Sequence, residues 1–177
     1  RHEFEKGVSI APKARLHGSG HIKGEAHIAG DVEPHDGNVV IEGKLSMDAS
    51  ARAIFTIPNS SRIAVSDRAD LAGILTIQLT AGTTPSPTDV FPLITYAARQ
   101  GMFANAADGA RLAVTGGTLK VNYTATGLVL TDFQSGSPGG DTDGDGIDDD
   151  WARRYFGASP LRGGSGDNDR DGDNDRD

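Results

Sequence analysis

The chain contains no cysteine, few aromatic residues and no long apolar run among its 177 residues. Without cysteine it has neither disulfide bonds nor thiolate chemistry, so outside a cell a bound metal ion would be a reasonable substitute crosslink. No stretch approaches the roughly 18 apolar residues of a membrane span, so we expect no membrane insertion. Because the chain begins with Arg1 rather than Met, we expect a processed or excised piece, and the lack of a signal peptide says nothing about export.

Catalytic motifs are missing as well. The sequence has no nucleophile elbow, no phosphate-binding loop and no His-Glu-x-x-His motif. Polysaccharide-cleaving β-helices use paired carboxylates, and Glu25, Asp31, Glu33 and Asp36 are candidates for such a pair. Acidic residues at this spacing are more often solvated surface groups, and a substrate cleft needs more coils than this region supplies. We therefore predict a protein that is not an enzyme.

What the chain does have is glycine, 24 residues in all, together with many Thr, Val and Ile. This composition predicts an all-β body with many turns. Residues 8–36 follow a rhythm of six, in which Ile10, Leu16, Ile22 and Ile28 each open a unit. Gly18, Gly24 and Gly30 occupy the third place of the later units. Such a repeat is typical of a β-solenoid, with one aliphatic side chain per unit turned inward and glycine at the bends. A plain antiparallel strand pair is the alternative.

From residue 38 onward the period changes to two, which predicts short strands. Residues 37–135 are therefore expected to continue as an antiparallel β-sandwich or a solenoid cap. The predicted strands are 39–47, 53–57, 62–65, 73–79, 90–96, 118–123 and 127–131, and the last two form a hairpin around 124–126. The boundaries that follow are a β-rich body over 1–135, a linker over 136–140 and a separate tail over 141–177.

The tail carries almost all of the net charge. Its twelve Asp and five Arg give it a charge of −7, out of −8 for the whole chain. An acidic tail on a nearly neutral body argues against nucleic acid as a partner. The carboxylates recur at every second residue around Gly146, and alternate Asp side chains on a curved loop can converge on Ca²⁺, which takes about six to eight oxygen ligands. A solvated acidic linker is the alternative for each Asp run.

A short helix is predicted over residues 151–156, after Asp148–Asp150 and before Gly157. Acidic residues at its start, Arg near its end and a glycine just beyond are the usual signals of a helix.

Two stretches resemble known families. The motifs at 43–47, 70–77, 89–94, 101–103 and 121–123 make residues 16–132 similar to the C-terminal region of secreted bacterial proteins with autotransporter-associated or passenger-like β-strand repeats. Residues 141–157 resemble thrombospondin type 3 or dockerin-like calcium segments, in which an Asp loop leads into a Trp-containing helix. Together the resemblances imply an exported, β-rich protein at the cell surface, with calcium bound by the tail.

The calcium loops depart from the family pattern at one position. If Asp141 is the first loop residue, the ligands are Asp141, Asp143, Asp145, the carbonyl of Ile147, and Asp149. The twelfth position is Ala152, where an EF-hand has a bidentate Glu. The second loop would use Asp167, Asp169, Asp171, the carbonyl of Asp173, and Asp175, and the sequence stops before its twelfth position. We therefore expect the two loops to complete each other.

The histidines offer a weaker metal hypothesis. The six-residue step could stack His21 over His27 on adjacent strands or faces, although solenoid surfaces commonly carry such polar ladders.

These observations predict a non-catalytic extracellular structural protein whose calcium-ordered tail stabilises its fold or its assembly. Unpaired solenoid edges would favour a homo-oligomer, a homopolymer or a surface filament. A carbohydrate-binding or adhesin module that holds a surface glycan is the alternative. It would need a surface row of aromatic residues, but Phe55, Phe91, Tyr96, Phe103 and Tyr123 fall at positions expected to be core.

Overall fold

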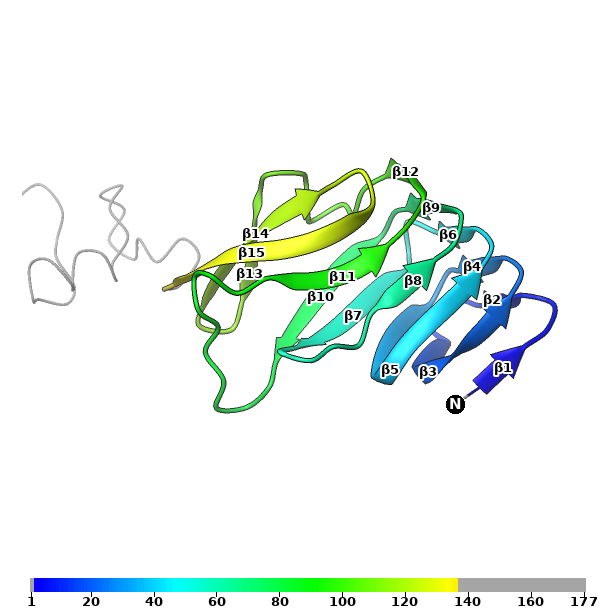
Figure 1. The fold of residues 1–177 in the computed structure, drawn as a ribbon, viewed down its shortest axis with the longest axis horizontal. Coiled ribbons are helices and arrows are strands. Elements are labelled where there is room, and N and C mark those ends of the chain that lie inside the picture. The colour runs from blue at the N-terminus through cyan, green and yellow to red at the C-terminus, as the bar shows by residue number, and fades with distance from the viewer. Residues whose placement is uncertain (1, 137–177) are drawn as a thin grey trace, which may run out of the picture.

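A computed structural model describes residues 2–136, which form strands and turns without a helix, as the composition predicted (Figure 1). The strands are β1 (His2–Phe4), β2 (Val8–Ile10), β3 (Arg15–Lys23), β4 (Ala26–Ile28), β5 (Asp31–Glu42), β6 (Leu45–Met47), β7 (Arg52–Ile57), β8 (Ile63–Val65), β9 (Arg68–Leu71), β10 (Ile74–Leu79), β11 (Phe91–Thr95), β12 (Ala98–Gly101), β13 (Arg111–Val114), β14 (Gly117–Tyr123) and β15 (Gly127–Ser135). No described segment is a helix long and apolar enough to cross a membrane.

The first twelve strands form a β-solenoid of about four turns. One parallel ladder runs β1–β3–β5–β8–β11, and a second runs β2–β4–β6–β9–β12. A third face joins the first halves of β3 and β5 to β7 and β10. β3 and β5 are long because each passes through a change of register, between Gly18 and Gly20 in β3, and so contributes to two faces.

The rhythm of six in the sequence corresponds to one third of a coil. Val8 on β2 lies beside Ala26 on β4, three units of six further along the chain, and Ala26 lies beside Leu45 on β6 after a step that is longer by one residue. Gly24 and Gly30 occupy the bends on either side of β4, as predicted. The next step, from Leu45 to Ala69, is longer again because a loop separates β7 from β8.

The predicted end of the solenoid at residue 36 is wrong. Parallel pairing continues to Gly101 at the end of β12, and antiparallel pairing is confined to β11 and β13–β15. Most strands predicted after residue 38 lie at the predicted places, but the strand predicted over 39–47 is divided between β5 and β6, and β9, β12 and β13 were not predicted. The pairing direction of the strands was not predicted, because parallel and antiparallel strands share the same side-chain period of two.

The core consists of inward side chains stacked in columns from coil to coil. Successive members are Phe4, Ile22 and Ile41 in the first column, Val8, Ala26 and Leu45 in the second, Ile10, Ile28 and Met47 in the third, and Leu16, Val32 and Ala53 in the fourth. The members of the second and third coils are all at most 5% exposed. Each interior layer is therefore covered on both sides by its neighbours.

An antiparallel sheet closes the C-terminal end of the solenoid (Figure 1). β15 pairs with β11, and β14 and β13 extend the sheet beyond it. The predicted hairpin between 118–123 and 127–131 is confirmed as β14 and β15, with the Thr124 amide donating to the Gly127 carbonyl at 2.8 Å. The fold is thus a solenoid with a cap, in agreement with one of the two expected continuations.

The free edge of β10 is covered by a side chain rather than a strand. The Leu75 amide donates to Asn105 Oδ1, and Asn105 Nδ2 donates to the Leu75 carbonyl, both at 2.9 Å. The side-chain amide therefore makes the two hydrogen bonds that a neighbouring strand would make.

The described residues end at Gly136, so the predicted linker over 136–140 lies outside them beyond its first residue. The tail over 141–177 and the helix over 151–156 lie outside them.

Candidate functional site

All ten predicted calcium ligands lie outside the described residues: Asp141, Asp143, Asp145, Ile147, Asp149, Asp167, Asp169, Asp171, Asp173 and Asp175. Within 2–136, no three His, Asp or Glu residues come together in a way that could hold a metal ion. The functional groups that the structure does place are the charged side chains on the outside of the solenoid.

The expected stacking of His21 over His27 is wrong. His21 is on β3, in the first ladder, whereas His27 is on β4, in the second. His21 Nε2 lies 3.1 Å from Glu42 Oε1, and His27 Nε2 lies 2.9 Å from Asp48 Oδ1. A six-residue step advances the chain by one face rather than one coil, so it separates the two rings.

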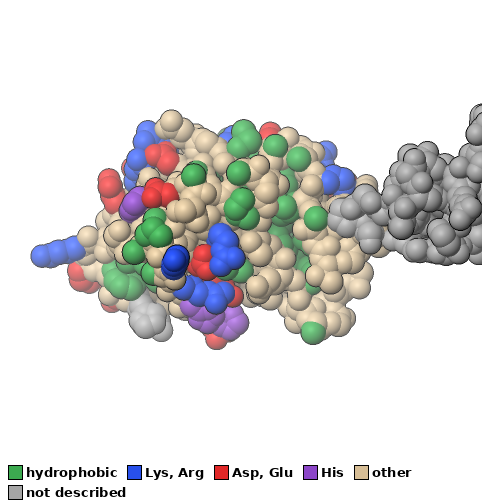
Figure 2. All heavy atoms as spheres, turned by 180° about the vertical axis from the view of Figure 1, so that it is seen from behind, with side chains coloured by type: hydrophobic (Ala, Val, Ile, Leu, Met, Phe, Trp, Pro, Cys, Tyr) green, Lys and Arg blue, Asp and Glu red, His purple; other side chains and the backbone are tan. Residues whose placement is uncertain are grey.

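A stacked pair does exist, between His17 on β3 and His35 on β5, with ring centroids 5.0 Å apart and planes inclined by 26°. This pair belongs to what we call the Glu33 cluster, a group of outward side chains on the third face of the solenoid. Its members are Arg15, His17, Asp31, Glu33, His35 and Arg52. Figure 2 shows acidic and basic side chains interleaved on the side of the molecule facing away from the viewer of Figure 1, with histidines beside them.

Glu33 is the one charged side chain among the described residues that is buried, with 7% of its surface exposed. The Arg15 guanidinium contacts Glu33 Oε2, and His17 Nε2 lies 3.9 Å from the same oxygen. An uncompensated buried carboxylate would be costly, so the contact with Arg15 is what allows Glu33 to lie against the sheet.

Asp31, two residues before Glu33, forms a two-pronged ion pair with Arg52 on β7. Arg52 Nε and Nη2 donate to Asp31 Oδ1 and Oδ2 at 2.9 and 2.7 Å. The hydrogen bonds from Arg52 lower the pKa of the Asp31 carboxyl; partial burial opposes this, and the charges of Arg52 and Arg15 add to the lowering. Asp31 is therefore held as a carboxylate.

This geometry shows what the four acidic candidates can do. Asp31 and Glu33 each face an Arg of an adjacent coil, Asp36 lies at an exposed bend 3.6 Å from His35, and Glu25 lies at the corner before β4. A general acid must hold a proton near the working pH, and the Asp31 carboxylate is held ionised instead. The arrangement links coils. Its partners are separated along the chain by a whole coil, so no short sequence motif marks them.

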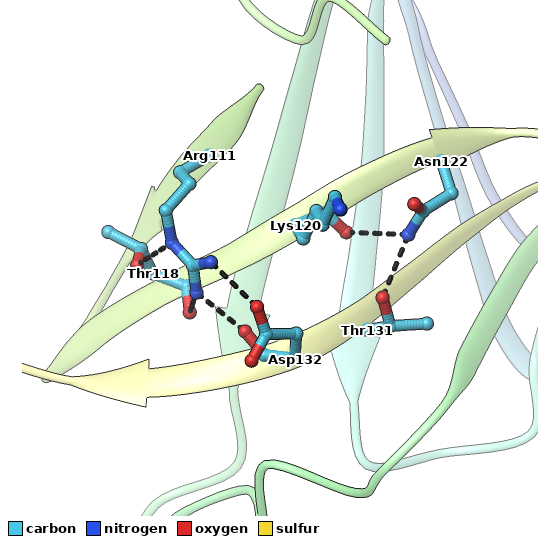
Figure 3. A network of polar contacts seen from close by, with 6 residues as sticks. All are labelled: Arg111, Thr118, Lys120, Asn122, Thr131 and Asp132. Atoms are coloured by element: carbon cyan, nitrogen blue, oxygen red, sulfur yellow. Dashed lines mark hydrogen bonds and ion pairs between the residues drawn. The ribbon is translucent and has the colours of Figure 1, made fainter. Parts of the chain in front are cut away.

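A second polar network lies on the C-terminal sheet (Figure 3). Arg111 Nε donates to Thr118 Oγ1 at 2.7 Å, and Arg111 Nη1 donates to Asp132 Oδ2 at 2.9 Å, while Nη2 reaches the backbone carbonyls of both partners. Asn122 Nδ2 donates to Thr131 Oγ1 at 2.8 Å. Most donors of Arg111 are thereby used between strands, so the network braces β13, β14 and β15.

The aromatic side chains lie mainly inside the protein, as predicted. Phe55, Phe91, Tyr96 and Phe103 are at most 8% exposed. Tyr123 is partly buried: its hydroxyl accepts from the Phe103 amide and donates to the Ala106 carbonyl, and Arg99 lies 4.5 Å above its ring. The Tyr123 hydroxyl thereby joins β14 to the segment after β12, and the four buried rings do not form a row on the surface.

No family model, no curated protein and no solved structure matches this chain.

Proposed function

We propose that this protein is a non-catalytic structural module that works outside the cell, with a self-supporting β-solenoid body and a calcium-binding tail. The observation that carries this proposal is that the outward charges of the body are used to join its coils. Lys23 on β3 contacts Glu3 and Glu5 in the first coil, and Lys44, just before β6, contacts Asp70 on β9, the next strand of the second ladder. Arg15–Glu33 and Arg52–Asp31 do the same on the third face.

A solid interior supports a structural role. The inward columns fill the solenoid, and a hollow beside β1, lined by Leu16, Gly18 and Ser19 among others, has a volume of only about 10 Å³. That is room for about one water molecule. A body of this kind resists deformation and presents an ordered surface, which suits a spacer or a scaffold at the cell surface.

The tail would supply the response to calcium. Without a cation, closely spaced carboxylates repel one another, and Ca²⁺ removes this repulsion when it binds them. Because Ala152 replaces the bidentate Glu of the first loop and the second loop lacks its twelfth position, the proposal requires ligands from both loops around the bound ions.

Calorimetric titration of the full chain with Ca²⁺ tests this part of the proposal. We expect binding, and we expect Asp143→Asn in the first loop and Asp169→Asn in the second each to weaken it at least tenfold. Mg²⁺ should bind far more weakly because it demands stricter octahedral geometry. No heat of binding at millimolar Ca²⁺ would overturn the calcium assignment. Two independent sites, each lost with one substitution only, would overturn the shared loops.

Self-assembly, expected from the sequence, would use the strand edges that are unpaired within residues 2–136. Those at the C-terminal end of the body are the outer edges of β12 and β13, each the last strand of its sheet. The two ends of the solenoid differ: the cap covers β11 and Asn105 covers β10, whereas the first coil has no such cover among the described residues.

A further inference from the structure

The N-terminal end of the solenoid has the structure of an interior coil. The inward residues of the first coil, Val8, Ile10 and Leu16, stand in the same columns as Ala26, Ile28 and Val32 of the second coil. The second-coil residues are 1–2% exposed, whereas the first-coil residues are only partly buried. Their outer sides form an apolar end surface that no described residue covers.

The backbone of the first coil also follows the interior pattern. Gly7 stacks on Gly24, which stacks on Gly43, so one corner runs in register through the first three coils. A Cβ at Gly7 would lie 2.4 Å from the Glu25 carbonyl oxygen, and one at Gly43 would lie 2.6 Å from that of Gly24. The Gly7 amide donates to the Lys23 carbonyl at 2.8 Å. Nothing at this corner ends the repeat, and β1 and β2 are the outermost strands of their ladders in the described part of the chain.

The charges at this end indicate what could cover it. Glu3 and Glu5 point outward from the first coil, and Lys23 of the coil above contacts both, at 3.2 and 2.9 Å. A coil below would continue this ladder if it placed a Lys or Arg under Glu5. A second copy related by a two-fold axis fits poorly. If β1 paired antiparallel with β1 of the other copy around Phe4, Glu3 of each copy would lie opposite Glu5 of the other, and these like charges would repel.

We propose that the N-terminal end is a docking surface for a further parallel β-coil that matches the first two in register, with a basic side chain facing outward beside Glu3 and Glu5. Such a coil extends both open ladders by one strand and covers Val8, Ile10 and Leu16 from below. The proposal does not depend on calcium, so it can fail while the tail still binds metal.

The test inserts a copy of residues 20–38 between Arg1 and His2 of the full chain, since Gly20 and Val39 share one register position with His2. The copied Lys23 then falls under Glu5. We expect the melting temperature to rise by about 5–10 °C as the half-covered first-coil side chains become buried. Amides of β1 and β2 should exchange with solvent at least tenfold more slowly in the chain with the insertion than in the parent chain.

Two matched insertions serve as controls. In one, the copied Ile22 and Ile28 become Ser, and the rise in melting temperature should vanish. In the other, the copied Lys23 becomes Glu, and the rise should be smaller than with Lys. The proposal is overturned if the unaltered copy gives no more stability and no more amide protection than the Ser control.

The parent chain gives a second test that needs no insertion. Ile10→Glu at the end surface should lower the melting temperature by less than half as much as Ile28→Glu, one layer further in. Equal losses would show that other residues of this chain already cover the end. Light scattering of the parent chain and of Ile10→Glu checks the occupant: a dimer that Ile10→Glu dissociates would show that a second copy covers the end surface, which also overturns the proposal.

Discussion

A methyl group added at the corner between β9 and β10 tests how closely the coils stack. Gly73 has φ = +79°, and a Cβ there would lie 2.1 Å from the Ala51 carbonyl oxygen and 2.9 Å from that of Asp48, both in the coil before. Gly82 has nearly the same backbone angle, φ = +77°, but no atom lies within 4 Å of the place that its Cβ would take. Gly73→Ala and Gly82→Ala therefore share the strain of a positive φ, but only Gly73→Ala brings a Cβ too close to the preceding coil.

The shared strain is the left-handed backbone conformation, which costs a residue with a Cβ about 1–2 kcal/mol. Gly82→Ala should lose about this amount. At Gly73 the Ala51 turn must also withdraw by roughly 1 Å to reach an ordinary contact distance. That movement breaks the hydrogen bond from the Ile74 amide to the Ala51 carbonyl, now 2.9 Å, and loosens a residue that is 0% exposed.

A buried backbone pair left without partners costs about 1–3 kcal/mol for each group. We therefore expect Gly73→Ala to lose about 4–5 kcal/mol in total, about 3 kcal/mol more than Gly82→Ala. Urea unfolding of the full chain in EDTA, followed by circular dichroism, measures both free energies of unfolding under conditions free of metal effects. If the two variants differ by less than about 1 kcal/mol, the coil-to-coil distance at this corner is wrong.

Two further predictions concern polar contacts. Asn105→Leu should lower the free energy of unfolding by about 2–3 kcal/mol because it removes both hydrogen bonds to the Leu75 backbone. The control Asn122→Leu, on the outer face of the cap, should lower it by under about 1 kcal/mol. Equal losses in the two variants would mean that Asn105 does not cover the β10 edge. Hydrogen bonding to Arg52 lowers the pKa of Asp31, and hydrogen bonding to Lys44 and Arg68 lowers that of Asp70. Their stabilisation is therefore complete above the unfolded-state pKa of about 3.9 and is lost as the pH falls through the lower folded-state values. Unfolding curves between pH 7 and pH 2 should show that the free energy of unfolding of Asp31→Asn falls less steeply below about pH 4 than that of the parent chain. The same dependence on pH in both proteins would refute the ion pair between Asp31 and Arg52.

The body could be predicted from the sequence in outline because its signals are local. Ile22 and Ile28 are spaced by six, and Gly24 and Gly30 mark the bends around β4, so the sequence pattern indicates a solenoid where the coils are shortest among the described residues. From residue 38 onward, loops of different length separate the strands, and the rhythm of six disappears although the coils continue.

The pairing of side chains could not be predicted in the same way. Whether His27 faces His21 or Asp48 depends on which residues lie beside each other in successive coils. The number of residues per coil is not constant: Arg15 lies beside Asp31, whereas Ile63 lies beside Ile94, which is much further along the chain. Pro92, which has no amide proton to donate, lies at a register shift where β11 has β15 as its only neighbour in the described part of the sheet.

Hydrogen–deuterium exchange of the full chain, measured with Ca²⁺ and with EDTA, tests the central proposal most directly. We expect core amides between residues 2 and 136 to be protected equally in both samples, and amides of residues 141–177 to exchange at least tenfold more slowly with Ca²⁺. Tail amides that exchange at the same rate in both samples would contradict a calcium-ordered tail. Loss of protection throughout the solenoid in EDTA would contradict a self-supporting body.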